Sequence, residues 1–146
     1  ERIEGQDGRV LTSFSRTVVD RPLSEETSRI MREILARVVG EGTGAQAASP
    51  HFRLGGKTGT AVKMGKMGAY SDNLYVTSFV GFGPAEAPKL ALMVVVDEPR
   101  KTGFRPLGGA IPTGGAVAAP VAGKVLHRML HLLAEREARG ELWARK

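Results

Sequence analysis

Cysteine is absent from this chain of 146 residues, so disulfide bonds and thiolate chemistry are excluded. The absence is consistent with a protein exported from the cell, where stray thiols are hazardous. No apolar run is long enough to cross a membrane, and no signal peptide is visible. Aromatic residues make up only 5% of the chain, so aliphatic side chains must build most of the core.

The remaining composition is that of a soluble globular protein. Hydrophobic residues make up 42% of the chain and charged residues 25%, and the length suffices for one core. The net charge of +6 and the isoelectric point near 10.1 raise the question of an anionic partner. The basic residues are scattered and not interleaved with aromatics, so the sequence does not predict a nucleic-acid partner.

We expect residues 1–146 to be one segment of a single domain, because no interior linker or repeat is visible and the first residues resemble the middle of a domain. Residues 1–23 are predicted to be an extended lead-in, with a turn at Gln6 to Arg9 that could close a short hairpin. Residues 135–146 are predicted to be a charged tail, and residues 99–115 a loop rich in glycine and proline.

Two helices are predicted. Ser24 is a good N-cap residue for a helix over 25–39, whose apolar residues recur at helical spacing and which Gly40 ends. A second helix is predicted over 116–134, where Pro120 is tolerable only in the first turn. Its apolar stripe needs a partner, so we expect it to pack across a sheet.

Three strands are predicted near 52–61, 74–83 and 89–98. The short connections between them favour antiparallel pairing, and residues 62–73 are predicted to be a loop. The third strand is apolar on both faces, which predicts a place in the centre of the sheet. The predicted fold class is therefore α+β, an antiparallel sheet with packed helices.

Lys57-Thr58-Gly59-Thr60, within the run Leu54 to Ala61, is the most informative stretch of the sequence. Its glycines free one edge of the backbone, so the main chain of a substrate can approach and pair as an added strand. The lysine supplies positive charge and the threonines supply hydroxyl donors, a combination that suits a carboxylate or a developing oxyanion. A lysine in an ordinary turn is the alternative for the triplet alone.

An ordered series of short motifs surrounds this stretch. In chain order the motifs are Val38-Val39, Gly42-Thr43-Gly44, Gly56-Lys57-Thr58-Gly59-Thr60-Ala61, Ser78-Phe79-Val80-Gly81-Phe82, Pro88, Asp97-Glu98-Pro99, Gly114-Gly115 and Ala118-Ala119-Pro120. From about Pro22 to Leu133, the chain resembles the C-terminal part of a penicillin-binding protein transpeptidase domain, a fold shared with serine β-lactamases. The match is best to the class B, division-type members, with the elongation type as second choice.

This resemblance implies a D,D-transpeptidase that cross-links peptidoglycan stem peptides through a serine acyl-enzyme in septal cell-wall synthesis and is a target of β-lactams. It implies no cofactor and no metal. It also implies a place at the extracytoplasmic face of the bacterial inner membrane, anchored by an N-terminal segment outside this chain. Other division proteins are expected as partners.

The family uses three motifs: Ser-x-x-Lys with the nucleophile, Ser-x-Asn for proton transfer, and Lys-Thr-Gly. Only the third stands in its place here, because no serine is followed by lysine three positions later. Ser71-Asp72-Asn73 has the form of the second motif but follows Lys-Thr-Gly, so we interpret it as a polar turn. The chain alone is therefore expected to be inactive without an upstream segment that carries the first two motifs.

The resemblance assigns roles within the strand. Lys57 would form the electrostatic floor of the site, and Thr58, Gly59 and Thr60 would bind substrate, with both hydroxyls on its carboxylate. The Thr60 backbone N–H would donate to the oxyanion. Strand alternation places Thr58 and Thr60 on one face and Lys57 and Gly59 on the other, so Lys57 must reach the site around the edge.

Other candidates are weaker. His51 precedes the strand, and His127 and His131 have the i, i+4 spacing that can chelate a metal, but no third ligand is apparent. Asp97 and Glu98 resemble a paired carboxylate, although a turn role before Pro99 is favoured.

Two other functions are open on the sequence alone. One is a non-catalytic module that keeps the strand to bind a ligand or partner, and the other is a serine β-lactamase fragment. An accompanying segment with Ser-x-x-Lys would distinguish an enzyme from a binding module.

Overall fold

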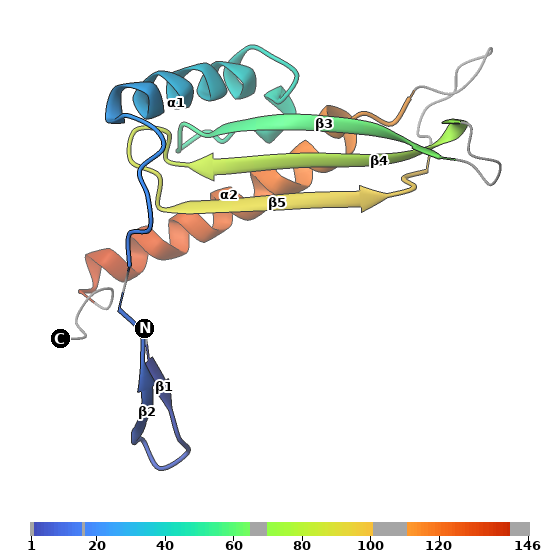
Figure 1. Ribbon diagram of the computed structural model, residues 1–146. Coiled ribbons are helices and arrows are strands. Elements are labelled where there is room, and N and C mark those ends of the chain that lie inside the picture. The colour runs from blue at the N-terminus through green and yellow to red at the C-terminus, as the bar shows by residue number, and fades with distance from the viewer. Residues whose placement is uncertain (1, 16, 65–69, 101–110, 141–146) are drawn as a thin grey trace.

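The computed structural model of the chain describes residues 2–15, 17–64, 70–100 and 111–140 (Figure 1). Its elements are β1 (Arg2–Glu4), β2 (Val10–Ser13), α1 (Glu25–Gly40), a short 3-10 helix η1 (Ala45–Ala47), β3 (Gly55–Met64), β4 (Tyr70–Gly83), β5 (Leu90–Asp97) and α2 (Gly114–Ala138). The fold is α+β, as the sequence predicts.

The main sheet has the strand order β3-β4-β5, and both pairings are antiparallel. The ladder places Thr58 opposite Phe79 and Phe79 opposite Val94. The three predicted strands and their direction are thus confirmed. The first strand begins at Gly55 rather than residue 52, because the Ser49 hydroxyl accepts the Phe52 backbone N–H and holds the preceding residues in a turn.

The loop predicted over 62–73 is wrong at both ends. Residues 62–64 belong to β3 and residues 70–73 to β4, because the two strands continue to pair until Met64 lies opposite Tyr70. The interpretation of residues 71–73 as a turn is wrong for the same reason. Residues 65–69 lie outside the described part of the chain.

The position predicted for the third strand is also wrong. β4 is the central strand, with Thr77 and Phe79 fully buried, whereas β5 lies at the edge. Met93 and Val95 on the outer face of β5 are 61% and 52% exposed. Apolar side chains on both faces show that a strand can be buried, but they do not specify which strands lie beside it.

The helix α1 begins and ends as predicted. Its N-cap residue Ser24 accepts a hydrogen bond from the Thr27 backbone N–H at 3.0 Å, and Glu25 and Glu26 lie in the first turn. Acidic residues there interact favourably with the positive end of the helix dipole.

The helix α2 is longer than predicted at both ends. Thr113 caps it by accepting the Ala116 backbone N–H at 3.2 Å, so the helix begins at Gly114 and Pro120 falls beyond the first turn. Proline there removes one helical hydrogen bond, to the carbonyl of Ala116, and the helix continues through it. Residues 135–138 are helical, so the predicted tail is wrong for them, while 141–146 lie outside the described part.

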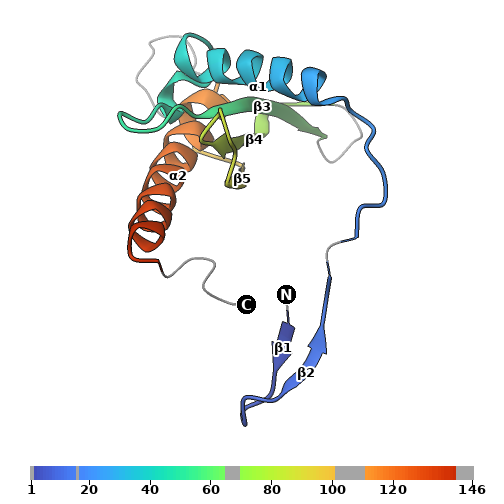
Figure 2. The ribbon, with the colours of Figure 1, turned by 90° about the vertical axis from the view of Figure 1, so that its left-hand side faces the viewer.

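One hydrophobic core lies between the sheet and the helices on the α2 side. Figure 1 shows α2 crossing behind the sheet and α1 running along its β3 side, and Figure 2 shows α2 at the left of the sheet. The buried core residues are Val39, Ala47, Leu54, Phe79, Ala118, Ala119, Ala122, Leu126 and Leu130. The predicted packing of the last helix across the sheet is confirmed, and alanines on its buried face permit a close approach.

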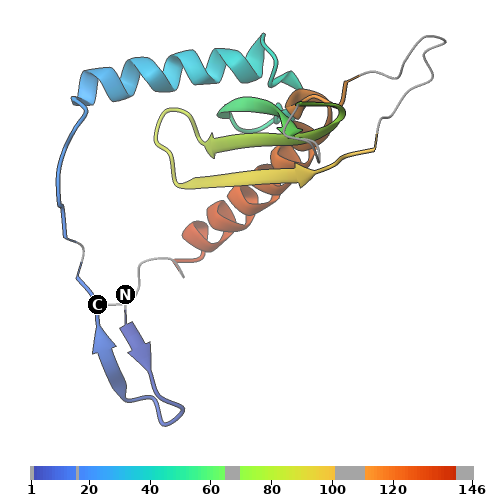
Figure 3. The same ribbon diagram turned by 45° about the vertical axis from the view of Figure 1, so that its right-hand side comes forward.

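The predicted N-terminal hairpin is confirmed. β1 and β2 pair antiparallel, with Ile3 opposite Thr12, and Gly8 adopts a φ of 77° in the turn that joins them. An extended stretch connects this hairpin to α1 (Figure 3).

Candidate active site on strand β3

The strand β3 lies at one edge of the sheet. Among the described residues it pairs with β4 alone, so the other side of its backbone has no strand partner there, although α1 packs against β3. An extended peptide can add to such an edge through main-chain hydrogen bonds. The free edge therefore suits the backbone of an extended ligand.

Gly56 lets the beginning of β3 lie directly on the core. A Cβ atom at this position would lie 2.4 Å from the ring of Phe79 and 2.6 Å from the carbonyl oxygen of Val80. Any side chain would displace a fully buried phenylalanine, so the close approach requires glycine. The packing fixes the strand immediately before Lys57.

The register agrees with the predicted alternation of side chains. Thr58 and Thr60 lie opposite Phe79 and Thr77, which are buried beneath the helices, whereas Lys57 lies opposite the exposed Val80. The lysine and the two threonines therefore begin on opposite faces of one strand.

The side chain of Lys57 folds over the backbone of its own strand. Its Nζ atom donates a hydrogen bond of 2.8 Å to the carbonyl oxygen of Thr58. Within the described ranges no carboxylate forms an ion pair with this lysine. Its positive charge is thus not neutralised by the surrounding side chains, and the site favours an anion.

The two threonine hydroxyls contact different parts of the chain. Thr58 Oγ1 lies 3.0 Å from Thr43 Oγ1, and Thr60 Oγ1 accepts a hydrogen bond of 3.0 Å from the backbone N–H of Gly114. A hydroxyl has one donor and two acceptor sites, so Thr60 can still donate its hydrogen to a carboxylate. Thr43 and Gly114 were not predicted to contact the site, although the motifs that contain them are visible in the sequence.

The N-terminus of α2 packs against β3 beside Thr60. A Cβ atom on Gly114 would lie 2.4 Å from the carbonyl oxygens of Gly59 and Ser78. The helix therefore starts within contact distance of the motif strand, where its dipole adds positive potential. Lys57 and this helix end favour negative charge at the same stretch of β3.

The histidines form a separate cluster. Among His51, His127 and His131, the ring centroids lie 4.5 to 5.5 Å apart, so His51 packs against the i, i+4 pair of histidines on α2. In the part of the chain that the structure describes, no group of side chains is arranged to hold a metal ion. His127 is about 20 Å along α2 from Gly114, given a rise of about 1.5 Å per residue, so the cluster lies away from the contact between Gly114 and Thr60.

Partial burial is the main cause that lowers the pKa of His127, and the neighbouring His131 and His51 add to the effect. The ring nitrogen Nδ1 of His127 lies 2.8 Å from Ser49 Oγ. The cluster thus joins the segment before β3 to the middle of α2.

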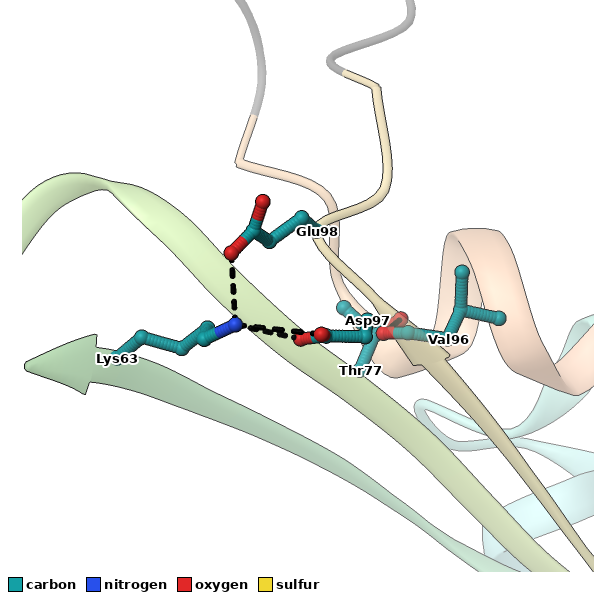
Figure 4. Close-up of polar contacts among 5 residues, drawn as sticks. All are labelled: Lys63, Thr77, Val96, Asp97 and Glu98. Atoms are coloured by element: carbon teal, nitrogen blue, oxygen red, sulfur yellow. Dashed lines mark hydrogen bonds and ion pairs between the residues drawn. The ribbon is translucent and has the colours of Figure 1, made fainter.

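Asp97 ends β5, and Glu98 lies one residue beyond the strand, in a bend. Both carboxylates form ion pairs with Lys63 (Figure 4). An ion pair between Lys63 and these two carboxylates was not predicted from the sequence. Neither α-helix of the described ranges has the length and apolar character needed to span a bilayer.

An antiparallel sheet covered by a C-terminal helix, with Lys-Thr-Gly-Thr on its edge strand, defines the class of penicillin-binding folds that the sequence resembles. The family profile of the penicillin binding protein transpeptidase domain matches residues 4–127. The chain belongs to this family.

The curated relatives of the chain agree with this family assignment. The chain is 45% identical over 108 residues to the stage V sporulation protein D of Bacillus subtilis, a match that covers 74% of this chain and 15% of the relative. It is 37% identical over 114 residues to the probable peptidoglycan D,D-transpeptidase PenA of Neisseria gonorrhoeae, covering 77% of this chain and 18% of the relative. The chain thus spans less than a third of the length of these relatives.

Solved structures share the fold. The transpeptidase domain of Burkholderia pseudomallei penicillin-binding protein 3 matches with a TM-score of 0.63 and 38% identity, over 75% of this chain and 31% of that one. Penicillin-binding protein 3 of Mycobacterium tuberculosis, complexed with ampicillin, matches with a TM-score of 0.67 and 28% identity, over 92% and 29%. The resemblance to the C-terminal part of a class B transpeptidase domain is confirmed.

Proposed function

We propose that this chain is the C-terminal segment of the transpeptidase domain of a peptidoglycan D,D-transpeptidase that cross-links stem peptides in septal cell-wall synthesis. The observation that supports this most directly is the placement of Lys57, Thr58 and Thr60 on an open-edged strand beside the N-terminus of α2. The family profile and the name of the Neisseria gonorrhoeae relative support a transpeptidase over a β-lactamase.

In this proposal a stem peptide pairs with the free edge of β3. Its carboxylate accepts hydrogen bonds from the hydroxyls of Thr58 and Thr60, and the charge of Lys57 favours its binding. A serine from an upstream Ser-x-x-Lys segment attacks the peptide carbonyl and gives its proton to a base; the peptide C–N bond then breaks, and the terminal residue leaves as the amine that takes up this proton. The acyl-enzyme that remains passes its acyl group to an amine of a second stem peptide, which frees the serine and completes the cross-link. The Thr60 backbone N–H donates to the oxyanion, a contribution of about 10²–10³ in rate for one such donor.

The same groups would receive the carboxylate of a β-lactam. The complete protein would act at the extracytoplasmic face of the inner membrane, anchored by a segment outside this chain and working with other division proteins. Upstream Ser-x-x-Lys and Ser-x-Asn motifs would complete the site.

The test is acylation of the full-length protein by a fluorescent penicillin. We expect Lys57→Ala to affect the reaction more than the fold: the acylation rate should fall clearly, while the melting temperature changes less. The reason is that the ammonium acts on charge that develops in the transition state. Lys89→Ala is a matched control, since Lys89 is exposed and ion-paired with Glu137 on α2. Acylation of Lys57→Ala at the parent rate would show that the proposed site is wrong.

A binding module without catalysis gives a different result. It would retain a penicillin only reversibly, and no covalent adduct would survive denaturation of the full-length protein.

A further inference from the structure

Lys63 connects the two outer strands of the sheet. Its Nζ atom, on β3, lies 3.0 Å from Oδ1 of Asp97 and 2.7 Å from Oε1 of Glu98, at the end of β5 (Figure 4). β4 lies between these strands. The lysine side chain therefore spans the central strand and ties β3 to a strand with which it has no ladder of its own.

This contact lies where the ladder between β3 and β4 becomes irregular. The pairing advances residue by residue until Val62 lies opposite Tyr75, but Met64 then lies opposite Tyr70. The extra residues are in β4, and Lys63 is the β3 residue within the irregularity. Because a bulge interrupts the regular ladder and redirects side chains, the placement of β3 beyond Val62 depends on further contacts, among them those of Lys63.

Glu98, which accepts the Lys63 contact next to β5, has an unusual backbone conformation. Its φ of 48° is uncommon for a residue with a side chain, and its backbone N–H donates to the carbonyl oxygen of Tyr75 at 2.9 Å. The carboxylates of Glu98 and, to a smaller extent, Asp97 raise the pKa of Lys63. The backbone of Glu98 is thus held by β4 and its side chain by β3.

A second contact meets β3 at Thr60, the last residue of the motif. The chain that leaves β5 at Glu98 contacts β3 again at Gly114, whose N–H donates to Thr60 Oγ1. The segment from Thr60 to Lys63 is therefore held at both ends. Gly114, where α2 begins, contacts Thr60, and Glu98, which follows β5, contacts Lys63. The Gly114 contact thus lies at the residue directly after Lys-Thr-Gly, and the Lys63 contact lies three residues further along β3.

We propose that Lys63 is a positioning residue for acyl transfer, which holds Thr58 to Thr60 in the strand geometry that receives the carboxylate and the oxyanion. This inference rests on the proposed function. Lys63 acts through the strand, because its own amino group is occupied by the two carboxylates.

The expected effect is larger on the reaction than on folding. The ion pair is partly exposed, with the Lys63 side chain 32% and the Asp97 side chain 64% accessible, and exposed pairs contribute little to stability. The reaction rate, in contrast, is sensitive to misplacement of the reacting groups, where about 1 Å can cost about a hundredfold.

The experiment compares Lys63→Met, Lys63→Arg and Lys89→Met in the full-length protein. Lys89 is the matched control, because it forms an exposed ion pair with Glu137 on α2, away from β3. For each variant, stopped-flow labelling with a penicillin gives the acylation rate constant at saturation and the dissociation constant of the initial complex. The melting temperature is measured beside them.

We expect Lys63→Met to lower the acylation rate constant about tenfold. Lys63→Arg should restore it to within about threefold of the parent, because arginine can donate to both carboxylates. Lys89→Met should leave the rate constant unchanged, and the three variants should have similar melting temperatures.

Acylation of Lys63→Met at the parent rate, together with slow acylation of Lys57→Ala, would overturn this inference and leave the proposed function standing. Parent rates in both variants would overturn both. A loss of rate in Lys63→Met that only parallels a fall in melting temperature, or that Lys63→Arg does not reverse, would also overturn the positioning role.

Discussion

The backbone N–H of Gly114 donates a hydrogen bond of 3.0 Å to Oγ1 of Thr60, a residue 54 positions earlier in the chain. This bond joins the first residue of α2 to the motif strand β3. Because the N–H groups in the first turn of a helix have no partner within the helix, the threonine also satisfies one of these donors. A single contact therefore serves both the fold and the candidate site.

We predict that Gly114→Ala destabilises the protein. The new Cβ atom would lie 2.4 Å from two backbone oxygens, those of Gly59 and Ser78, which cannot move without shifting the sheet. The expected loss is about 1–3 kcal/mol, the usual cost of forcing extra atoms into a packed site. Urea unfolding monitored by circular dichroism measures it.

Gly40→Ala is the control for this substitution. Gly40 is the last residue of α1 and has nothing within 4 Å of its Cβ position. The control should be neutral or slightly stabilising, since alanine favours helix. Equal stability of Gly114→Ala and Gly40→Ala would contradict the packing described for α2.

Thr60 provides a second prediction, in the full-length protein. Thr60→Val removes the hydroxyl but keeps the backbone N–H, so the dissociation constant of a penicillin should rise while the acylation rate constant changes less. Thr60→Ser keeps the hydroxyl and should bind like the parent. Stopped-flow labelling separates the two constants, and an unchanged dissociation constant for Thr60→Val would argue against a carboxylate contact.

The third prediction concerns residues 1–146 alone. No serine in this sequence is followed by lysine three positions later, and acyl transfer needs an activated nucleophile. The isolated chain should therefore form no covalent adduct with a fluorescent penicillin after denaturing electrophoresis. An adduct mapped by mass spectrometry to any serine of the chain would disprove the assignment of motifs.

The fourth prediction is a dependence of stability on pH. Partial burial, His131 and His51 lower the pKa of His127 in the folded state, so the unfolded chain binds a proton more readily. The contribution to stability is fully present above the unfolded value of about 6.5 and is lost as the pH falls through the lower folded-state pKa. Urea midpoints at pH 8 and pH 5 should differ more for the parent than for His127→Gln.

Glutamine can keep a hydrogen bond to Ser49 and does not titrate, so His127→Gln isolates the ionisation. If both proteins lost the same stability between the two pH values, the histidine cluster would not be the cause.

Local patterns predicted much of the fold and the identity of the motif strand. Ser24 and the spacing of apolar residues defined α1, because a helix depends on contacts within a few positions. Alternation likewise placed Lys57 and Thr58 on opposite faces of β3. These features depend only on neighbouring residues, which a sequence shows directly.

Contacts between distant segments could not be predicted in this way. The pairing of Lys63 with Asp97 and Glu98 depends on an irregular ladder, and the contact of Thr43 with Thr58 depends on how α1 ends beside β3. The edge position of β5 was missed because its sequence shows how apolar it is but not how many strands flank it.

The edge position of β5 has a practical consequence. In the described part of the chain it pairs only with β4, so one row of its peptide groups is unpaired next to the exposed side chains of Met93 and Val95. A long apolar strand with an open row of this kind is a template for aggregation. The apparent molar mass of residues 1–146 expressed alone, measured by light scattering, should therefore grow with protein concentration, and Met93→Lys should suppress that growth.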